Sequence, residues 1–355
     1  MSFKCGLVGM PNVGKSSIFN LLTKQTISAD NYPFCTIDPN NAFVEVPDSR
    51  LAKLASINKS KKIINAAIEF VDIAGLIKGA STGEGLGNEF LTHIKQTDVI
   101  AHVVRFFKDD DVIHVNGSPN PESDFQDINL ELILSDLSAT QKYSDYLKKS
   151  KRPLKNKLEL IKDIDSLIQH LSEEKPAREF NYTENLKNLT DLKLLTKKPM
   201  FVIANVDENI EGAGKFKLDN RIDNIVPINA IIEQEIAGLN PEEQQIFLQD
   251  LGVKETALER IIKTGYELLD LKTFFTSGEK ESRAWAARKT YNASQCAGII
   301  HSDIEKGFIR AETIAYDDYI KFNGEQGSKN NGVWRQEGKD YLVEEGDVIY
   351  FRFNV

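Results

Sequence analysis

A short apolar run that ends in a glycine-rich turn restricts the fold of this chain more than any other feature of its sequence. Residues 3–8 (FKCGLV) have the character of a buried strand, and the turn at 9–16 (GMPNVGKS) follows directly. Ile18, Leu21 and Leu22 then recur on one face of a helical pattern. A strand, a tight turn and a helix in this order are typical of a sheet whose strands alternate with helices.

The turn fits the spacing G-x-x-x-x-G-K-[ST], in which successive backbone N–H groups point at a phosphate. The N-terminus of the following helix adds positive potential. In this arrangement Lys15 bridges the β- and γ-phosphates of a nucleoside triphosphate, and Ser16 ligates Mg²⁺. The sequence therefore predicts a P-loop in which Lys15 is also a catalytic residue. The expected nucleotide-binding residues of this turn are Asn12, Val13, Gly14, Lys15, Ser16 and Ser17.

Three further apolar runs indicate the rest of the sheet. Residues 68–73 (IEFVDI), 99–104 and 200–206 (MFVIANV) have the pattern of strands separated by helical stretches. This alternation predicts an α/β fold, a P-loop G domain with a mostly parallel sheet and helices on both faces. The interval before the last of these strands is too long for a βαβ unit of about 30 residues. Part of it must therefore be an insertion.

The surplus lies at 125–198, where no strand pattern occurs and leucine and isoleucine recur at helical spacing. Pro153 interrupts this spacing, which predicts an inserted coiled-coil hairpin of two antiparallel helices that turns near the proline. Residues 148–157 (KKSKRPLKNK) hold six basic residues at the predicted tip. A solvated turn is the plainer explanation of such a run of charge, and a contact with RNA is the functional one.

The composition changes again after about residue 271. Many of the aromatic residues of the chain lie there, and 348–353 (VIYFRF) has the pattern of a strong strand. We therefore predict a small, largely β C-terminal domain at 274–355. It follows a nucleotide-binding domain at 1–273 that contains the helical insertion at 125–198.

The second predicted strand ends in Asp72-Ile73-Ala74-Gly75, which fits D-x-x-G. An aspartate at the carboxyl end of a strand can hold Mg²⁺ through water, and the amide of Gly75 can meet the γ-phosphate. Thr36, between the P-loop and this strand, offers a second hydroxyl, although a simple turn residue is the alternative. We predict Ser16, Thr36 and Asp72 as the metal site and Gly75 as a catalytic residue.

Two departures from the usual GTPase pattern bear on the chemistry. Leu76 stands where many GTPases carry a water-orienting glutamine, so another group must place the water or hydrolysis is very slow. Guanine-specific enzymes carry N-K-x-D, whereas this chain has 205–208 as NVDE. Glu208 is longer than aspartate by one methylene, about 1.5 Å, so the paired contact with guanine fails and adenine is no longer rejected. The sequence predicts use of ATP, or relaxed use of ATP and GTP.

At these residues the chain resembles the Obg-like ATPase family, the YchF branch of the translation-factor-related P-loop proteins. The resemblance extends over essentially the whole chain. It rests on 9–17 (GMPNVGKSS), 31–40 (NYPFCTIDPN), 72–81 (DIAGLIKGAS), 205–208 (NVDE) and a C-terminal segment similar to a TGS domain of ubiquitin-like β-grasp fold. It implies a G domain with a helical insertion, Mg²⁺-dependent hydrolysis that favours ATP, and association with ribosomes.

The resemblance also implies roles for residues that spacing alone does not single out. His114 matches a histidine that helps to place the water, although a lone loop histidine is usually a solvated residue. Asn12 matches a P-loop asparagine associated with K⁺ use, which makes K⁺ a candidate activator. Val206 matches a residue whose backbone contacts adenine. Asn229 and Ala230 occupy the place of a serine–alanine loop, with asparagine for serine. The expected base-binding residues are Asn205, Val206, Glu208, Asn229 and Ala230.

Charge and composition limit the partners. The net charge of −9 argues against wholesale coating of nucleic acid, though not against a local basic patch. Three widely spaced cysteines suit a reducing cytosol, and no apolar run has the length of a membrane span or the pattern of a signal peptide. We expect a cytoplasmic monomer that binds ATP or GTP and contacts ribosomal RNA and protein, with no membrane partner.

Three functions are consistent with these features. The first is a slow Mg²⁺-dependent NTPase switch that couples nucleotide state to a ribosomal partner. A metabolic P-loop kinase would need an arginine-rich lid, and the sequence shows none. The remaining alternative is a nucleotide-gated regulator that binds a protein partner and hydrolyses nucleotide only incidentally, which Leu76 makes credible.

Overall fold

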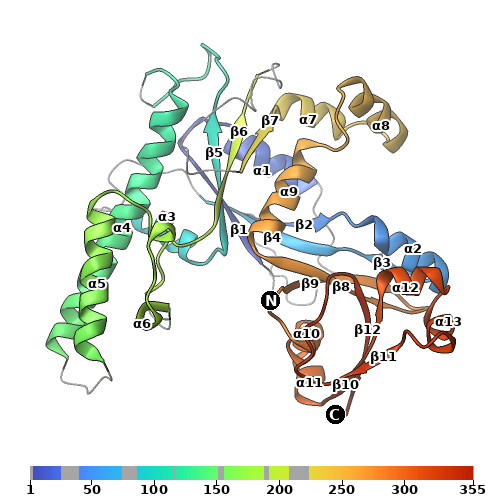
Figure 1. Ribbon diagram of the computed structural model, residues 1–355. Coiled ribbons are helices and arrows are strands. Elements are labelled where there is room, and N and C mark those ends of the chain that lie inside the picture. The colour runs from blue at the N-terminus through green and yellow to red at the C-terminus, as the bar shows by residue number, and fades with distance from the viewer. Residues whose placement is uncertain are drawn as a thin grey trace.

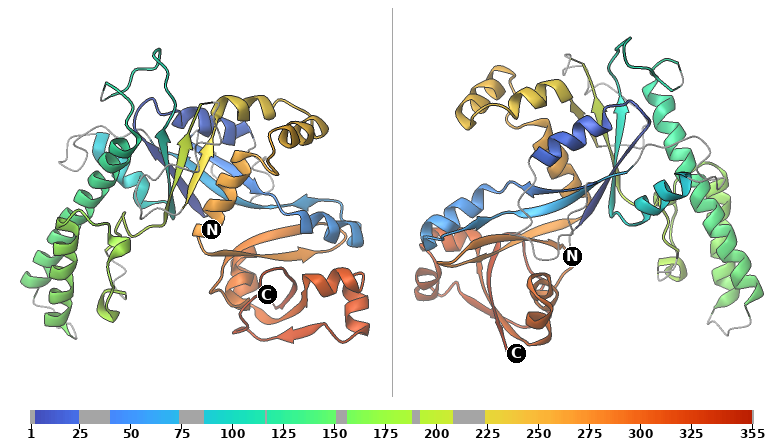
Figure 2. Two further views of the ribbon diagram at one scale, coloured as in Figure 1. Left: turned by 45° about the horizontal axis from the view of Figure 1, so that its top comes forward. Right: turned by 180° about the vertical axis from the view of Figure 1, so that it is seen from behind.

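Two six-stranded sheets and the helices packed on them form the described part of the chain (Figures 1 and 2). The computed structural model describes residues 3–24, 40–73, 86–115, 117–150, 156–187, 192–207 and 224–354. Buried residues of both sheets, such as Leu7 and Val348, belong to one continuous hydrophobic core. Within these ranges, no helix combines the length and the apolar character that crossing a membrane requires.

The first sheet has the strand order β2-β4-β1-β5-β6-β7. Neighbours from β4 to β7 in this order run parallel, and β2 is antiparallel to β4. The mostly parallel sheet predicted from the sequence is therefore confirmed. Its strands span Lys4–Gly9 (β1), Asn41–Val46 (β2), Ala66–Asp72 (β4), Val99–Arg105 (β5), Met200–Asn205 (β6) and Ile225–Ile228 (β7).

Helices cover both faces of this sheet. Figures 1 and 2 show α3 and α4 on one side of the central strands and α1, α7 and α9 on the other. Side chains of α1 and α9, such as Ile18 and Ile261, are fully buried in the main core. The helices span Lys15–Lys24 (α1), Ser49–Asn58 (α2), Leu86–Lys95 (α3), Ala230–Ile236 (α7), Pro241–Asp250 (α8) and Ala257–Leu268 (α9).

Two long helices, α4 (Pro121–Lys149) and α5 (Lys157–Ser172), project from the sheet side by side (Figure 1). The N-terminal part of α4 packs on the first sheet, where Phe125 contacts strands β5 and β6. Farther along, early residues of α4 meet late residues of α5 and the reverse, so the two helices are antiparallel. The predicted turn near Pro153 lies outside the described residues. The chain returns through a 3₁₀ turn (Ala177–Glu179) and α6 (Glu184–Lys187).

The second sheet has the order β11-β10-β12-β8-β9-β3. The strand expected at 348–353 is present as β12, and the last strand in the order, β3, comes from the N-terminal part of the chain. β8 begins at Leu271, just before the division predicted at 273/274. The strands span Ile63–Ile64 (β3), Leu271–Ser277 (β8), Ser282–Arg288 (β9), Phe308–Ala315 (β10), Arg335–Glu337 (β11) and Asp347–Phe353 (β12). Its helices are Ala293–Ile300 (α10), Ser302–Lys306 (α11), Tyr316–Lys321 (α12) and Glu325–Asn330 (α13).

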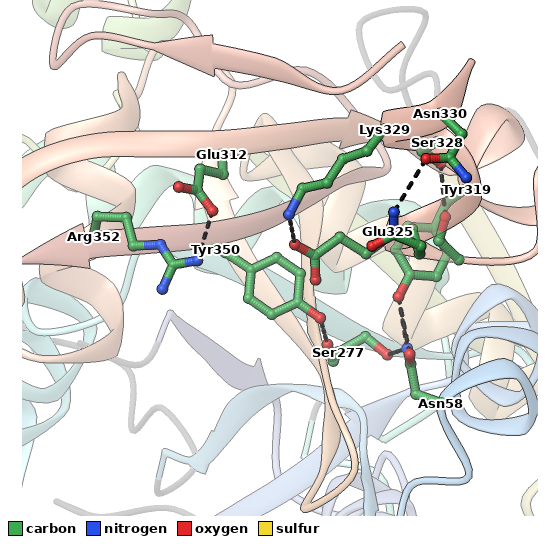
Figure 3. Close-up of polar contacts among 12 residues, drawn as sticks. Asn58, Ser277, Glu312, Tyr319, Glu325, Ser328, Lys329, Asn330, Tyr350 and Arg352 are labelled. Atoms are coloured by element: carbon green, nitrogen blue, oxygen red, sulfur yellow. Dashed lines mark hydrogen bonds and ion pairs between the residues drawn. The ribbon is translucent and has the colours of Figure 1, made fainter. Parts of the chain in front are cut away.

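Polar contacts at the end of α2 fasten the second sheet to the first (Figure 3). Nδ2 of Asn58 donates to the hydroxyl oxygens of Ser277, at 2.6 Å, and of Tyr319, at 2.8 Å. The hydroxyl of Tyr350 donates to the carbonyl oxygen of Ser277. One helix of the N-terminal half is therefore bonded to β8 and α12, and β12 is bonded to β8. With the shared hydrophobic core, these contacts make the two sheets one packed unit.

Candidate nucleotide-binding site

The P-loop joins β1 to α1 through a turn that its sequence makes possible. Asn12 and Gly14 have φ angles of 62° and 90°, in the left-handed region that favours asparagine and glycine. A Cβ on Gly14 would overlap Nδ2 of Asn205, so glycine is required there for space as well as for conformation. Nδ2 of Asn205 donates to the carbonyl oxygen of Val13 at 3.0 Å, inside the protein. The end of β6 is thus tied directly to the P-loop.

The structure brings together two residues that lie far apart in the sequence. Nζ of Lys15, at the start of α1, forms an ion pair with Oδ1 of Asp72, at the end of β4. The side chains of Lys15 and Asp72 are 10% and 19% exposed, so the pair is largely withdrawn from water. Ser16 follows Lys15 on the same turn. A carboxylate and a hydroxyl beside the P-loop are oxygen ligands of the kind that Mg²⁺ takes, so the described residues fit this ion.

Four of the five predicted base-binding residues, Asn205, Val206, Asn229 and Ala230, lie where β6 and β7 end. The N–H group of Val206 donates to the carbonyl oxygen of Ile228 at 2.9 Å, so a contact of its backbone with a base would use the carbonyl group. Asn229 caps α7, since its Oδ1 accepts from the N–H groups of Ile231 and Ile232. Its side-chain oxygen is therefore occupied, and a contact with a base would use Nδ2. Ala230 is the first residue of α7.

Three predicted site residues, Thr36, Gly75 and Glu208, lie outside the described residues, as does Leu76. The metal site is therefore described only at Ser16 and Asp72.

His114 lies in the segment that follows β5 and is buried, with only 5% of its surface exposed. Its Nε2 lies 2.8 Å from Oδ2 of Asp124, in the first turn of α4. The same segment touches the P-loop, because Nδ2 of Asn12 donates to the carbonyl oxygen of Ile113 at 3.0 Å. The histidine thus lies next to a residue that the P-loop contacts.

Arg105, which sequence reasoning missed, organises this segment. It is the last residue of β5, is 1% exposed, and donates to the carbonyl oxygens of Phe107, Asp109 and Val112 at 2.9–3.2 Å. Its guanidinium carbon also lies 4.3 Å from the centre of the Phe107 ring. The signal available in the sequence was a charged residue at the end of a mostly apolar strand.

Asp124 was missed as well, and nothing in the sequence singles it out. It is an acidic residue in the first turn of a helix, where aspartate is common because it complements the helix dipole. Only the fold brings it against a histidine ten positions earlier.

A P-loop between β1 and α1, with the aspartate of D-x-x-G at the end of β4 and β2 antiparallel to β4, defines a P-loop nucleotide-binding protein of the GTPase type. Residues 4–132 match the family model described as "50S ribosome-binding GTPase". Residues 271–354 match the model YchF-GTPase_C, described as a protein of unknown function. The chain belongs to the YchF family.

Relatives support this membership over the full length. The chain is 48% identical to the "Ribosome-binding ATPase YchF" of Bacillus subtilis and 49% identical to that of Haemophilus influenzae, and each match covers 100% of both chains. The solved structure of the Schizosaccharomyces pombe YchF GTPase superposes with a TM-score of 0.87 at 36% identity, over 99% of this chain and 98% of the other. The resemblance found in the sequence is confirmed.

Proposed function

We propose that this protein is a Mg²⁺-dependent P-loop NTPase that hydrolyses ATP, in preference to or alongside GTP, and acts as a nucleotide-dependent switch on the ribosome. The observation that carries the proposal is the pairing of Lys15 with Asp72 beside a P-loop held in its turn by Asn205. The names of the bacterial relatives, ribosome-binding ATPases, agree with it.

The roles at the phosphates follow from the chemistry of the groups. Lys15 exchanges Asp72 for the β- and γ-phosphates when a nucleotide binds, which leaves the carboxylate to act with Ser16 and Thr36 as metal ligands. When bound, Mg²⁺ neutralises part of the phosphate charge. The amide of Gly75 donates to the γ-phosphate. Asn12 can present its side-chain oxygen to K⁺, because the contact with Ile113 uses Nδ2.

The base site no longer rejects adenine, because Glu208 replaces the aspartate that recognises guanine. Val206, Asn229 and Ala230 complete this site with Asn205. Since Oδ1 of Asn229 caps α7, hydrogen bonding to the base rests on Nδ2 and on the backbone. A site with few side-chain hydrogen bonds to the base selects weakly between adenine and guanine, which fits relaxed use of ATP and GTP.

His114 is the group that we propose places the attacking water, because Leu76 has no polar atom with which to do so. The burial of His114 agrees with slow basal hydrolysis.

Two surfaces are proposed for the ribosome. One is the basic tip of the hairpin, where Lys148 and Lys149 end α4. The other is the second sheet, which we propose to be a TGS domain of β-grasp fold that begins near residue 274. A cytoplasmic monomer suits this function.

The test is the release of inorganic phosphate from ATP and from GTP, with and without ribosomes, in K⁺ and in Na⁺. We expect ATP to be used at least as well as GTP, with phosphate released and no acceptor phosphorylated. Equal or tighter binding of GDP than of ADP would refute the base assignment. For the tip, replacing Lys148, Lys149, Lys151 and Arg152 with Glu should weaken ribosome co-sedimentation and flatten its dependence on salt.

A nucleotide-gated regulator with incidental hydrolysis is the second candidate, and the burial of His114 favours it. His114→Ala separates the two. Unchanged turnover together with partner binding that still follows ATP would support the regulator and refute the catalytic assignment of His114.

A further inference from the structure

The segment that carries His114 has a burial pattern opposite to the one that its composition favours. Ile113 and Val115 are 78% and 55% exposed, whereas the polar His114 between them is 5% exposed. Apolar side chains gain free energy when they leave water, and a polar group loses free energy unless it finds a partner. The observed arrangement therefore needs a compensating contact.

Asp124 supplies that contact. Nε2 of His114 lies 2.8 Å from Oδ2 of Asp124, and each side chain is 2% exposed. An ionised carboxylate can only accept, so the Nε2–H group of His114 is the donor. The other oxygen of Asp124, Oδ1, has no hydrogen-bond partner among the described residues. The main polar contact of this buried carboxylate is therefore the imidazole of His114. Only one of its two oxygens has a hydrogen-bond partner among the described residues.

The positions around His114 are anchored independently of this pair. Arg105 fixes three carbonyl groups within residues 107–112, and Asn12 of the P-loop holds the carbonyl oxygen of Ile113. Asn12 therefore connects the P-loop directly to the residue next to His114. If this segment turns over, Ile113 and Val115 can be buried and the imidazole exposed.

We propose that Asp124 is a positioning residue that holds His114 buried, and that loss of this contact frees the imidazole to act at the nucleotide site. The inference rests on the proposed function, in which His114 places the attacking water. It adds the residue that controls how accessible the histidine is.

The wild-type protein gives the first test. Diethyl pyrocarbonate modifies accessible imidazoles, and mass spectrometry of peptides reports each histidine separately. In the nucleotide-free protein His114 should react at least about tenfold more slowly than His301, whose side chain is 50% exposed. Equal rates at the two histidines would overturn the proposal.

Variants of Asp124 give the second test. Asp124→Asn keeps the size of the side chain and removes its charge, and a hydrogen bond to a charged group corresponds to about tenfold in an equilibrium. We expect His114 to react up to about tenfold faster in this variant and ATP turnover without ribosomes to rise by a similar factor. Asp124→Glu, which keeps the carboxylate, should restore most of the protection. Glu122→Gln removes an exposed charge from the same helical turn and should change neither quantity.

The results separate the two ideas. Unchanged reactivity of His114 in Asp124→Asn would overturn the positioning role, whatever happens to turnover. Reactivity that rises while turnover falls would also overturn it, because Asp124 would then support catalysis and not withdrawal. If reactivity rises while neither Asp124→Asn nor His114→Ala alters turnover, the positioning role stands and the catalytic role of His114 fails.

Discussion

Two buried aspartates, one in each half of the molecule, differ in how completely their carboxylates are satisfied. Asp347, at the start of β12, is 1% exposed and accepts hydrogen bonds from the hydroxyl of Tyr341 at 2.8 Å and the N–H group of Glu344 at 2.9 Å. Nη2 of Arg335 lies 3.4 Å from its other oxygen. Asp124, also 1% exposed, has His114 at one oxygen and no hydrogen-bond partner at the other within the described ranges.

The difference indicates what each carboxylate is for. A buried carboxylate with donors on both oxygens ties separate segments together and is costly to remove. Asp136 in α4 is another example, since it accepts from the N–H groups of Leu195 and Thr196 and fixes the return of the helical insertion. A buried carboxylate with one movable donor stabilises less and is easier to release. We therefore expect the contacts of Asp347 in the second sheet to persist and the segment at His114 to rearrange more easily.

The largest expected effect concerns the P-loop, in the half of the molecule that contains Asp124. Lys15→Ala removes the cation that we assign to the β- and γ-phosphates, and the loss of one such electrostatic contact costs about 10²–10³ in turnover. We expect ATP hydrolysis to fall by that factor while the second sheet stays folded. Phosphate release and circular dichroism measure the two effects. Lys24→Ala, at the exposed end of the same helix, is the matched control. Retained turnover in Lys15→Ala would contradict the phosphate site.

The next effect separates the two aspartates by stability. Asp347→Ala leaves the hydroxyl of Tyr341 and the N–H group of Glu344 without their acceptor, which should cost about 2–4 kcal/mol of the free energy of unfolding. Asp124→Asn should cost only about 1–1.5 kcal/mol, because asparagine can still accept from His114 although without the charge. Urea unfolding measures both, with Asp340→Ala as the exposed control. Equal losses of unfolding free energy in the two variants would mean that the two carboxylates stabilise the protein to the same extent.

The elements of the fold that could be predicted from the sequence are those whose signal lies within a few consecutive residues. The strands β1, β4, β5, β6 and β12 could be predicted because their apolar runs are continuous. β2 was missed because only alternate residues are buried along this edge strand, and β7 because Pro227 stands within its four residues. The P-loop is likewise a local pattern and could be read directly.

The contacts of the site were harder to predict because they join distant parts of the chain. That Lys15 and Asp72 belong to one site follows from the P-loop and D-x-x-G motifs, although their ion pair was not predicted. The burial of His114 against Asp124 depends on where α4 begins on the sheet. No spacing in the sequence encodes that placement. Polar residues at the ends of buried strands, such as Arg105, were the signal that could have drawn attention to this segment.

A smaller effect concerns the tie between β6 and the P-loop. Asn205→Ala removes the donor to the carbonyl oxygen of Val13, which is buried, and opens space beside Gly14. The loss of one hydrogen bond of about 1 kcal/mol should weaken nucleotide affinity about fivefold through a less ordered P-loop. Titration calorimetry with ADP measures it, and Asn20→Ala on the exposed face of α1 is the control. Affinity equal to that of the wild type would mean that the turn holds without this contact.

The smallest effect is a pH dependence of stability at Asp347, in the second sheet. Burial raises the pKa of Asp347, so the folded protein binds its proton at a higher pH than the unfolded chain does. The contribution of this group to stability therefore grows as the pH falls from neutral towards the pKa of an unfolded aspartate, and it is lost again as the pH rises.

Asp347→Asn should flatten the pH profile of the free energy of unfolding above about pH 4, where an unfolded aspartate has lost its proton. Asp340→Asn, which is exposed, should leave the profile as it is in the wild type. Urea unfolding at a series of pH values decides the matter. A profile of Asp347→Asn that is as steep as that of the wild type would show that Asp347 is charged to the same extent in both states. In that case the hydrogen bonds of Asp347 would offset the effect of burial on its pKa completely. The contrast with Asp124 would then rest only on the number of hydrogen-bond donors at each carboxylate.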